Sequence, residues 1–563
     1  MRSMKNCMQR KSLLERGLAL LVLLCLLPVA ALGENQDAAM DALAGSGDVA
    51  ADAAADPAYT DPAYVEQTYV QPTINMDADL RVGYVATGEI NPFVCTDRDL
   101  VSLNQLVFES VVELDDEMKP TPLLADSWTS EGKTWTFKLR EGVIFHNGAN
   151  LTAYEVLDSY NRFMLTNELN PYYERIQMIE SMEVQDELTL VVHSRVEGYV
   201  TLYAMTFPVV QGSTMDDAMP RGTGPYWYTE YVSGYGVRLE ANPLWWKKDP
   251  GIHSVAAVNY AETGAALEAL STNQINLLST QSTNAALYRK FSNLTSMDYP
   301  TTTFEMLVPN LSDDSPMGDV RMRQAVMYAI DRAAIANNAY LGMGIQCEVP
   351  VNPSSWLYES QSAMYYYSPE RALQLVQSCG WSDLTNDGYM NQIDGVVLKD
   401  LKIKILTYNE STSNVRANAV NMIADYLEAV GFQVEVEVRG KERALRMIKN
   451  KEYDLALVGV QLSEVPDLSD VFKSGGSLNL NGFKNDSMEL LLGQVSGAAT
   501  EEELKSLYSQ MQMVAVDRLP VLGLLFRTGT VLSKRSLAGL SGLRVSNTLN
   551  GIEFMSKQDG DSQ

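Results

Sequence analysis

The chain has 563 residues, a net charge of −28 at neutral pH and 46% apolar residues. This composition lies in the globular range and excludes a wholly disordered, collagenous or coiled-coil chain. The acidic excess argues against nucleic acid as a partner, because phosphate binding needs a basic surface, and the length suggests two to four domains or lobes.

Residues 1–33 are predicted to be a secretory signal peptide. A basic stretch precedes an apolar run at 18–32, which ends in the small-x-small pattern Ala31-Leu32-Gly33. The run is shorter than the roughly 20 residues that span a bilayer. Cleavage after Ala31 or Gly33 would export the chain, and the alternatives are an uncleaved anchor or a lipid on Cys25.

Residues 34–75 are predicted to form an acidic, Ala/Asp-rich disordered tether. Between 34 and 80 there are ten acidic residues and no Lys or Arg. Low hydrophobicity with like charge cannot offset the entropy of ordering such a segment. It would hold a folded body away from a cell surface, and the alternative is a terminus without a role.

The folded body is predicted to begin near Leu80. Strands are expected at 81–85, 135–140, 188–192 and 237–239, and a helix capped by Thr152 follows the second of them. Gly222 and Gly224 are expected to permit tight backbone turns.

The second half of the chain carries longer helical patterns, at 319–339, 369–379 and 414–430. Arg323 and Asp331, eight residues apart, would lie on similar faces of the first of these helices. The third lies between strands at 401–406 and 432–438, with Gly431 as its stop signal, which predicts a parallel β-α-β unit. The apolar run 453–460 predicts a buried strand.

Four groups of motifs follow one another along the folded body. The first is Leu124-Ala125-Asp126-Ser127-Trp128, continued by Thr134-Trp135-Thr136-Phe137-Lys138-Leu139-Arg140, Val143-Ile144-Phe145-His146-Asn147-Gly148 and Leu151-Thr152-Ala153-Tyr154-Glu155-Val156. The others are Gly222-Thr223-Gly224-Pro225-Tyr226 with Asn242-Pro243-Leu244-Trp245-Trp246, then the segment Asp319 to Arg332, and then Ala372 to Cys379-Gly380-Trp381. Together, over roughly 80–555, this chain resembles the extracellular solute-binding proteins of family 5, which are the oligopeptide- and dipeptide-binding components of bacterial ABC importers.

The resemblance implies an α/β fold, namely a two-lobed periplasmic-binding-protein-like clamp (type II, cluster C-like) with an extra subdomain in the first lobe. The implied division is a first lobe at 76–305 with the extra subdomain at about 100–220, a second lobe at 306–519, a return to the first lobe at 520–555 and a polar tail at 556–563. The chain would cross between the lobes near Pro309-Asn310 and near Pro520-Val521, and a bound solute would close the lobes by hinge motion.

The resemblance also implies a function. The chain would be a monomeric, exported protein, periplasmic or associated with the cell surface, which captures a small peptide or peptide-like solute for the permease subunits of an ABC transporter. The alternative is a surface receptor or sensor that uses the same fold for a non-peptide ligand without an importer. Neither reading includes catalysis, and the chain has no Gly-x-Ser-x-Gly elbow and no zinc-binding spacing of its three His.

The ligand site departs from the pattern of peptide-binding members. In those members an Asp four residues before a Pro receives the α-amino group, and the strand 453–460 followed by Pro466 places Leu462 at that position and Gly459 at that of an aromatic residue. Leu cannot pair with a buried ammonium. Either Glu464 takes over, or the ligand has no free amino terminus, which is the reading that we favour.

Ligands in α/β folds bind beyond the carboxyl ends of strands. That rule selects polar residues after the strands 401–406 and 453–460, and the resemblance adds a loop of the first lobe; the alternative for each is a solvated polar loop. The candidate ligand-binding residues are Tyr408, Asn409, Gln461, Ser463 and Glu464 in the second lobe and Phe93, Cys95, Thr96 and Asp97 in the first.

One segment resembles the calcium loop of EF-hand or dockerin type. It has Gly388 at position 6 and oxygen-bearing residues at positions 1, 3, 5, 7, 9 and 12. These residues are Asp383, Thr385, Asp387, Tyr389, Asn391 and Asp394. The alternative is an ordinary Gly/Asn/Asp turn. No cofactor is expected to be required, and calcium is a possible addition.

Overall fold

The computed structural model describes residues 73–410, 413–535 and 537–557. The signal peptide, Cys25, nearly all of the tether at 34–75 and most of the polar tail at 556–563 therefore lie outside the described residues. Within the described part, no helix is both long enough and apolar enough to span a bilayer.

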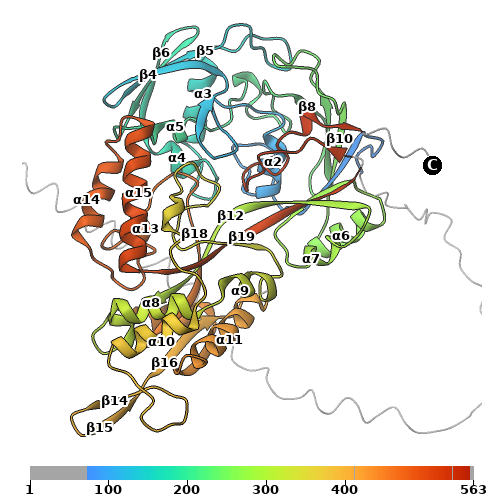
Figure 1. Cartoon of the computed structure of the whole chain (residues 1–563). Coiled ribbons are helices and arrows are strands. Elements are labelled where there is room, and N and C mark those ends of the chain that lie inside the picture. Colours follow the sequence, from blue (N-terminus) through green and yellow to red (C-terminus); the bar gives the residue numbers. More distant parts are fainter. Residues whose placement is uncertain (1–72, 411–412, 536, 558–563) are drawn as a thin grey trace, which may run out of the picture. The chain divides into compact units, whose positions relative to one another are not determined.

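An eleven-stranded mixed sheet runs through the described residues (Figure 1). Its strands follow the order β17-β16-β18-β12-β19-β11-β1-β10-β9-β8, and β13 pairs with β19 off this path. The strands are β1 Leu80–Tyr84, β8 Tyr226–Val232, β9 Gly236–Ala241, β10 Ser254–Asn259, β11 Leu277–Thr280, β12 Leu294–Pro309, β13 Gly344–Gln346, β16 Lys402–Tyr408, β17 Gln433–Arg439, β18 Leu455–Gln461 and β19 Leu522–Lys534.

A second, four-stranded antiparallel sheet lies within the segment 100–220 expected to form an extra subdomain. Its order is β4-β5-β7-β6. These strands are β4 Ala125–Glu131, β5 Thr134–Leu139, β6 Ile179–Asp186 and β7 Thr189–Ser194. The remaining strands form two-stranded pairs, β2 Val112–Leu114 with β3 Pro120–Pro122, β14 Asn391–Asp394 with β15 Val397–Asp400, and β20 Leu537–Ala538 with β21 Ser556–Lys557.

The helices connect and cover these sheets. Those before β12 are α2 Arg98–Asn104, α3 Ala153–Phe163, α4 Tyr173–Ile176, α5 Thr201–Ala204, α6 Thr263–Ser271 and α7 Ala285–Tyr288. Those after it are α8 Val320–Ala329, α9 Arg332–Asn338, α10 Pro369–Ser378, α11 Val415–Glu428, α12 Lys441–Lys449, α13 Ser469–Phe472, α14 Asp486–Val495 and α15 Glu501–Arg518. Thr152 caps α3 in a capping box with Glu155, as expected from the sequence.

The two long strands β12 and β19 connect the two parts of the fold. They pair antiparallel over most of their length, with a register irregularity between Pro300 and Phe304, and Figure 1 shows them side by side. The buried side chains of β12 on the two sides of this irregularity belong to different hydrophobic clusters. Tyr299 belongs to the hydrophobic cluster of the N-terminal part, and Phe304 belongs to that of the other part. The same change occurs on β19 between Phe526 and Val531.

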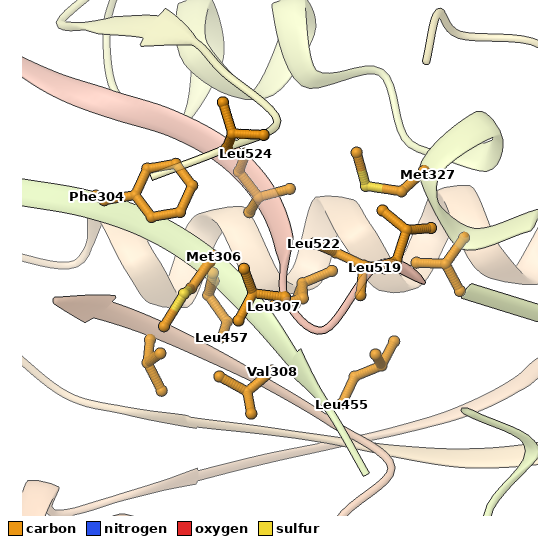
Figure 2. Close-up of a cluster of buried hydrophobic side chains, with 14 of the residues drawn as sticks. Phe304, Met306, Leu307, Val308, Met327, Leu455, Leu457, Leu519, Leu522 and Leu524 are labelled. Carbon is orange, nitrogen blue, oxygen red and sulfur yellow. The ribbon is translucent and has the colours of Figure 1, made fainter. Parts of the chain in front are cut away.

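The chain thus crosses between the lobes within the paired strands β12 and β19. The sequence predicts crossings near Pro309-Asn310 and Pro520-Val521, where turn-forming residues follow the apolar runs. In the structure β12 is still paired with β18 at Pro309, because the strand continues through the second cluster. Figure 2 shows the side chains of β12, β18 and β19 that meet there, including Met306, Leu457 and Leu522.

The predicted β-α-β unit is confirmed. β16 and β17 pair in parallel from Lys402 with Gln433 to Tyr408 with Arg439, and α11 connects them. Gly431 has a φ of 94°, which an L side chain rarely adopts, so it ends the helical segment as expected. The buried strand predicted at 453–460 is β18, whose residues from Leu455 to Val458 are buried.

The single helix expected at 319–339 is wrong, because the chain breaks into α8 and α9. Asp331 accepts a hydrogen bond from the Ala334 backbone N–H at 2.9 Å and so caps α9. Arg323 lies in α8 and donates to the Met317 and Arg518 carbonyl oxygens. The two side chains therefore do not share a helix face. The prediction failed because the apolar periodicity continues across Asp331, the capping residue at which a new helix starts.

Gly222 and Gly224 permit close backbone approach where the chain bends over 223–225. Neither glycine has a positive φ. A Cβ at Gly222 would overlap the Val107 carbonyl oxygen and crowd the Phe108 ring, and Gly224 N–H donates to the Val107 oxygen at 3.0 Å.

Gly222→Ala is expected to lower the free energy of unfolding by about 1–3 kcal/mol, because backbone cannot move aside as a flexible side chain can. Gly493→Ala is the matched control. It lies within α14 and a Cβ there would meet no atom within 4 Å, so it is expected to stabilise by about 0.5–1 kcal/mol. Urea unfolding of both variants measures the two effects, and equal signs would contradict the steric argument.

Candidate functional site

Two cavities share Glu464 and Arg544. The first is lined by residues of the first lobe and by Glu464 of the second, and the other is lined by residues of both lobes. We call the first the polar cavity. It has a volume of about 100 Å³, and its charged lining residues are Glu109, Glu113, Arg175, Lys247, Glu464, Arg544 and Glu553. The second, the apolar cavity, has a volume of about 80 Å³. Its apolar lining includes Pro300, Val351, Leu357, Leu462, Val465 and Phe526. Each volume has room for several water molecules or for one small chemical group.

The loop after β18 supplies the wall shared by both cavities. The Leu462 backbone N–H donates to the Thr302 carbonyl at 2.9 Å, so the loop is fixed to β12, and the Leu462 side chain lines the apolar cavity. Ser463 Oγ accepts the Val465 N–H at 3.1 Å. These bonds hold the loop in a defined position between the lobes.

An ion pair between Arg175 and Glu464 joins the lobes across the polar cavity. The distance is 2.9 Å, and the two side chains are 13% and 15% exposed. Arg175 lies in α4 and also donates to Thr206 Oγ1 at 2.8 Å, and its guanidinium lies 5.5 Å from the centre of the Tyr172 ring. Glu464 therefore has a charged partner in this structure.

Two further contacts join the two lobes. The Trp356 indole N–H donates to Tyr203 Oη at 3.0 Å, and both groups are buried. Lys119 and Glu501 form a 2.7 Å ion pair that is more exposed than the one at Glu464. The lobes are thus in direct contact around the cavities.

Glu109 is a buried carboxylate that lines the polar cavity. Its oxygens accept hydrogen bonds from the Trp245 and Trp246 indole N–H groups, at 3.1 and 2.8 Å, and from Thr223 Oγ1 at 2.8 Å. Burial raises the pKa of Glu109 to about 6, although these hydrogen bonds and the charge of Lys247 favour the ionised form.

The raised pKa predicts a pH-dependent stability. Folding favours protonated Glu109. The contribution of this group to the free energy of unfolding is therefore complete below the ordinary pKa of 4.5 and is lost as the pH rises through about 6. Relative to Glu109→Gln, the wild type is expected to lose about 2 kcal/mol of unfolding free energy over this range. Urea unfolding of both proteins at a series of pH values measures this, and a constant difference between them would contradict the prediction.

Among the residues predicted from the sequence, Ser463 and Glu464 line the cavities between the lobes. Tyr408 is buried, donates from its hydroxyl to the Gly459 carbonyl at 3.2 Å and has the Arg416 guanidinium over its ring at 4.5 Å. Gln461 contacts Thr302 and Thr303 on the neighbouring strand. Asn409 is exposed. These three residues lie outside the lining of both cavities.

The four candidates of the first lobe lie together, outside the lining of both cavities. Phe93 and Cys95 are buried in the N-terminal cluster, and burial raises the pKa of the Cys95 thiol to about 12. The Asp97 carboxylate accepts the Gly88 N–H at 2.8 Å. Phe93 and Thr96 line a separate surface pocket with Arg162.

The segment expected to resemble a calcium loop forms a hydrogen-bonded turn. Asp383 accepts the N–H groups of Asp387 and Gly388, at 3.2 and 3.0 Å, and Asn391 accepts the Leu384 N–H at 2.9 Å. Thr385 donates to Asn391, Asp387 accepts the Tyr389 N–H, and Asp394 ends β14. Of the described residues, no three His, Cys, Asp or Glu side chains gather as a metal-binding group.

Comparison with known proteins gives consistent matches. The family model described as "Bacterial extracellular solute-binding proteins, family 5 Middle" matches residues 119–478. The oligopeptide-binding protein AppA of Bacillus subtilis is 23% identical over 472 residues, covering 78% of this chain and 84% of AppA. The dipeptide-binding protein of Escherichia coli is 24% identical over 443 residues, covering 71% of this chain and 80% of that protein.

Solved structures show the same fold at low sequence identity. A structure of a nickel ABC transporter from Bacillus halodurans superposes with a TM-score of 0.73 at 20% identity, covering 84% of this chain and 98% of that one. This likeness agrees with the two-lobed α/β fold expected from the sequence.

Proposed function

The chain belongs to family 5 of the bacterial extracellular solute-binding proteins, and from this premise we propose that it captures a peptide or peptide-like solute between its lobes and delivers it to the permease of an ABC importer. The observation that carries the proposal is the pair of cavities whose walls come from both lobes and meet at Glu464 and Arg544. A solute there would contact both lobes at once and would favour the closed state.

Relatives named as oligopeptide- and dipeptide-binding proteins support a peptide-like solute. They favour import over a sensor that acts without an importer. We propose that the exported protein acts as a monomer outside the cytoplasm and that its role is binding without catalysis.

The chemistry of the loop after β18 supports a solute that needs no free amino terminus. Leu462 carries no charge, and Glu464 is already paired with Arg175. One other acid, Asp467, lines the apolar cavity and accepts the Ser469 N–H at 2.7 Å. Recognition of an ammonium by Asp467 or by a released Glu464 is therefore the competing reading.

A thermal-shift screen of the purified protein tests the proposal. The solutes are di- to pentapeptides, the same peptides after N-acetylation, oligosaccharides and calcium. A solute that binds only the native state raises the unfolding midpoint by mass action. We expect acetylated peptides to stabilise the protein as well as free ones do. Stabilisation by oligosaccharides alone would overturn the peptide-like ligand, and stabilisation by calcium would support a metal at 383–394.

Leu462→Asp makes the screen specific for this loop. A carboxylate at this position would provide a partner for an ammonium, so the variant is expected to prefer free-amine peptides over their acetylated forms. Leu490→Asp is the control, because Leu490 is 64% exposed on α14. If wild type already requires the free amine, then Asp467 or Glu464 recognises the ammonium.

A further inference from the structure

Arg544 is a half-buried cation without a partner. Within residues 73–410, 413–535 and 537–557, it is the only arginine of intermediate or lower exposure whose side chain makes no hydrogen bond, ion pair or ring contact. It lines both the polar and the apolar cavity. An unpaired guanidinium at the junction of two cavities is an unsatisfied binding group.

Five of the other six charged groups of the polar cavity have a partner, and the sixth, Glu553, forms no ion pair within 4.0 Å among the described residues. Arg175 pairs with Glu464 at 2.9 Å, Lys247 lies 3.9 Å from Glu113, and Glu109 accepts three hydrogen bonds.

The acids that favour the charged form of Arg544 are Glu464, Glu113, Asp116 and Asp115, and none of them forms an ion pair with it within 4.0 Å. Burial lowers the pKa of Arg544 in spite of these acids. An anion placed directly on the guanidinium would offset this desolvation cost.

Arg544 also lines the apolar cavity. Its walls near the β18 loop are Leu462, Val465 and Leu468, and Val545 follows Arg544 in the chain. Tyr508 also lines this cavity, and its hydroxyl is buried without a hydrogen-bond partner. The site therefore offers one cation, one free hydroxyl and apolar walls.

We propose that Arg544 binds a carboxylate of the solute and that the adjoining apolar group of the solute fills the cavity lined by Leu462. The inference rests on the proposed function and specifies it, since it assigns the solute class as a carboxylate-bearing, apolar peptide-like molecule. The planar guanidinium can bind both carboxylate oxygens at once, which an ammonium cannot do with the same geometry. Tyr508, whose hydroxyl has no hydrogen-bond partner, lines the same cavity.

The test uses matched pairs of probes on the full-length protein. N-acetylated di- to pentapeptides that end in leucine are prepared as free acids and as C-terminal amides. A charge-assisted hydrogen bond contributes roughly 1.5–3 kcal/mol, so the acids are expected to bind roughly 10- to 100-fold more tightly than their amides by calorimetry. Arg544→Gln is expected to remove this difference, and Arg544→Lys to retain part of it.

Arg518→Gln is the control, because Arg518 is 58% exposed and pairs with its neighbour Asp517. Its preference for acids over amides is expected to match that of the wild type. If Arg544→Gln lowers the unfolding midpoint in the absence of a probe, the test rests on Arg544→Lys, which keeps the cation and is expected to retain part of the preference for acids.

The outcomes separate the inference from the function on which it rests. Equal binding of acids and amides by wild type, or an acid preference that persists in Arg544→Gln, overturns the role of Arg544 while the peptide-like function stands. If no peptide of either form binds the wild type, the proposed function fails and the inference fails with it. If the preference for acids is lost in Arg544→Gln but kept in Arg518→Gln, the result supports both the role of Arg544 and the proposed function.

Discussion

Glu305→Gln is expected to lower the free energy of unfolding by about 3–5 kcal/mol, because it removes the central anion of a buried charge network. Glu305 lies on β12 and is fully buried. It accepts from Arg416 Nη2 at 2.8 Å and from Arg527 Nε at 2.6 Å. Glu410 contacts both arginines as well, at 3.3 and 2.8 Å. The glutamine would leave two largely buried cations to share Glu410.

The pH dependence gives an independent check on this network. Burial opposes ionisation of Glu305, but Arg416 and Arg527 outweigh it and hold the pKa of Glu305 below its ordinary value of 4.5. The stability from Glu305 is therefore complete above pH 4.5 and is lost as the pH falls through the lowered pKa. The difference between wild type and Glu305→Gln should be constant near neutrality and should shrink in acid.

Urea unfolding at neutral pH measures the effect. Glu435→Gln is the matched control, because Glu435 pairs with Lys402 at 3.6 Å and both side chains are more than half exposed. Exposed pairs contribute at most about 1 kcal/mol. A cost for Glu305→Gln as small as that for Glu435→Gln would show that the network contributes little to stability.

The network also explains one departure from the family pattern. A Cβ at Gly459 would overlap the Arg416 guanidinium and the Glu305 carboxylate. An aromatic side chain at this position is therefore incompatible with the arginine and glutamate as they lie here. The glycine that the sequence places at the aromatic position makes room for a buried ion pair at the crossing between the lobes.

Local patterns predict much of the fold. Strand and helix periodicity with Gly431 predicted the parallel β16-α11-β17 unit, because those residues interact mainly with their neighbours in sequence. The continuous helix at 319–339 was wrong because apolar periodicity does not reveal a new helix start, although Asp331 carries the capping signal.

The site could be predicted only in part. Ser463 and Glu464 follow a strand end and reach the cavities, as the strand-end rule selects. Arg175 and Arg544 lie 289 and 80 residues from Glu464 along the chain, and no local pattern brings such residues together. Phe93 and Cys95 were selected by resemblance, and in this chain their side chains pack in the core.

Breaking the ion pair between Arg175 and Glu464 is expected to weaken solute binding roughly 30-fold or more, because it removes a contact that exists only when the lobes meet. Truncating one partner of a buried, hydrogen-bonded charge pair costs about 2–5 kcal/mol. If the cost falls on the closed state alone, the closed population and the apparent affinity fall by the same factor. Glu464→Gln and Arg175→Gln should therefore have similar effects.

A double-mutant cycle separates this coupling from other effects of each residue. In the double variant Arg175→Gln with Glu464→Gln no unpaired charge remains, so it is expected to bind the solute better than the sum of the single changes predicts. Lys119→Gln is the control, because the Lys119–Glu501 pair also joins the lobes but is about one-third exposed. Small-angle scattering without solute should show a larger radius of gyration for the single variants than for Lys119→Gln. Strictly additive effects in the cycle would mean that Arg175 and Glu464 act separately, and that closure depends instead on the buried Trp356–Tyr203 contact.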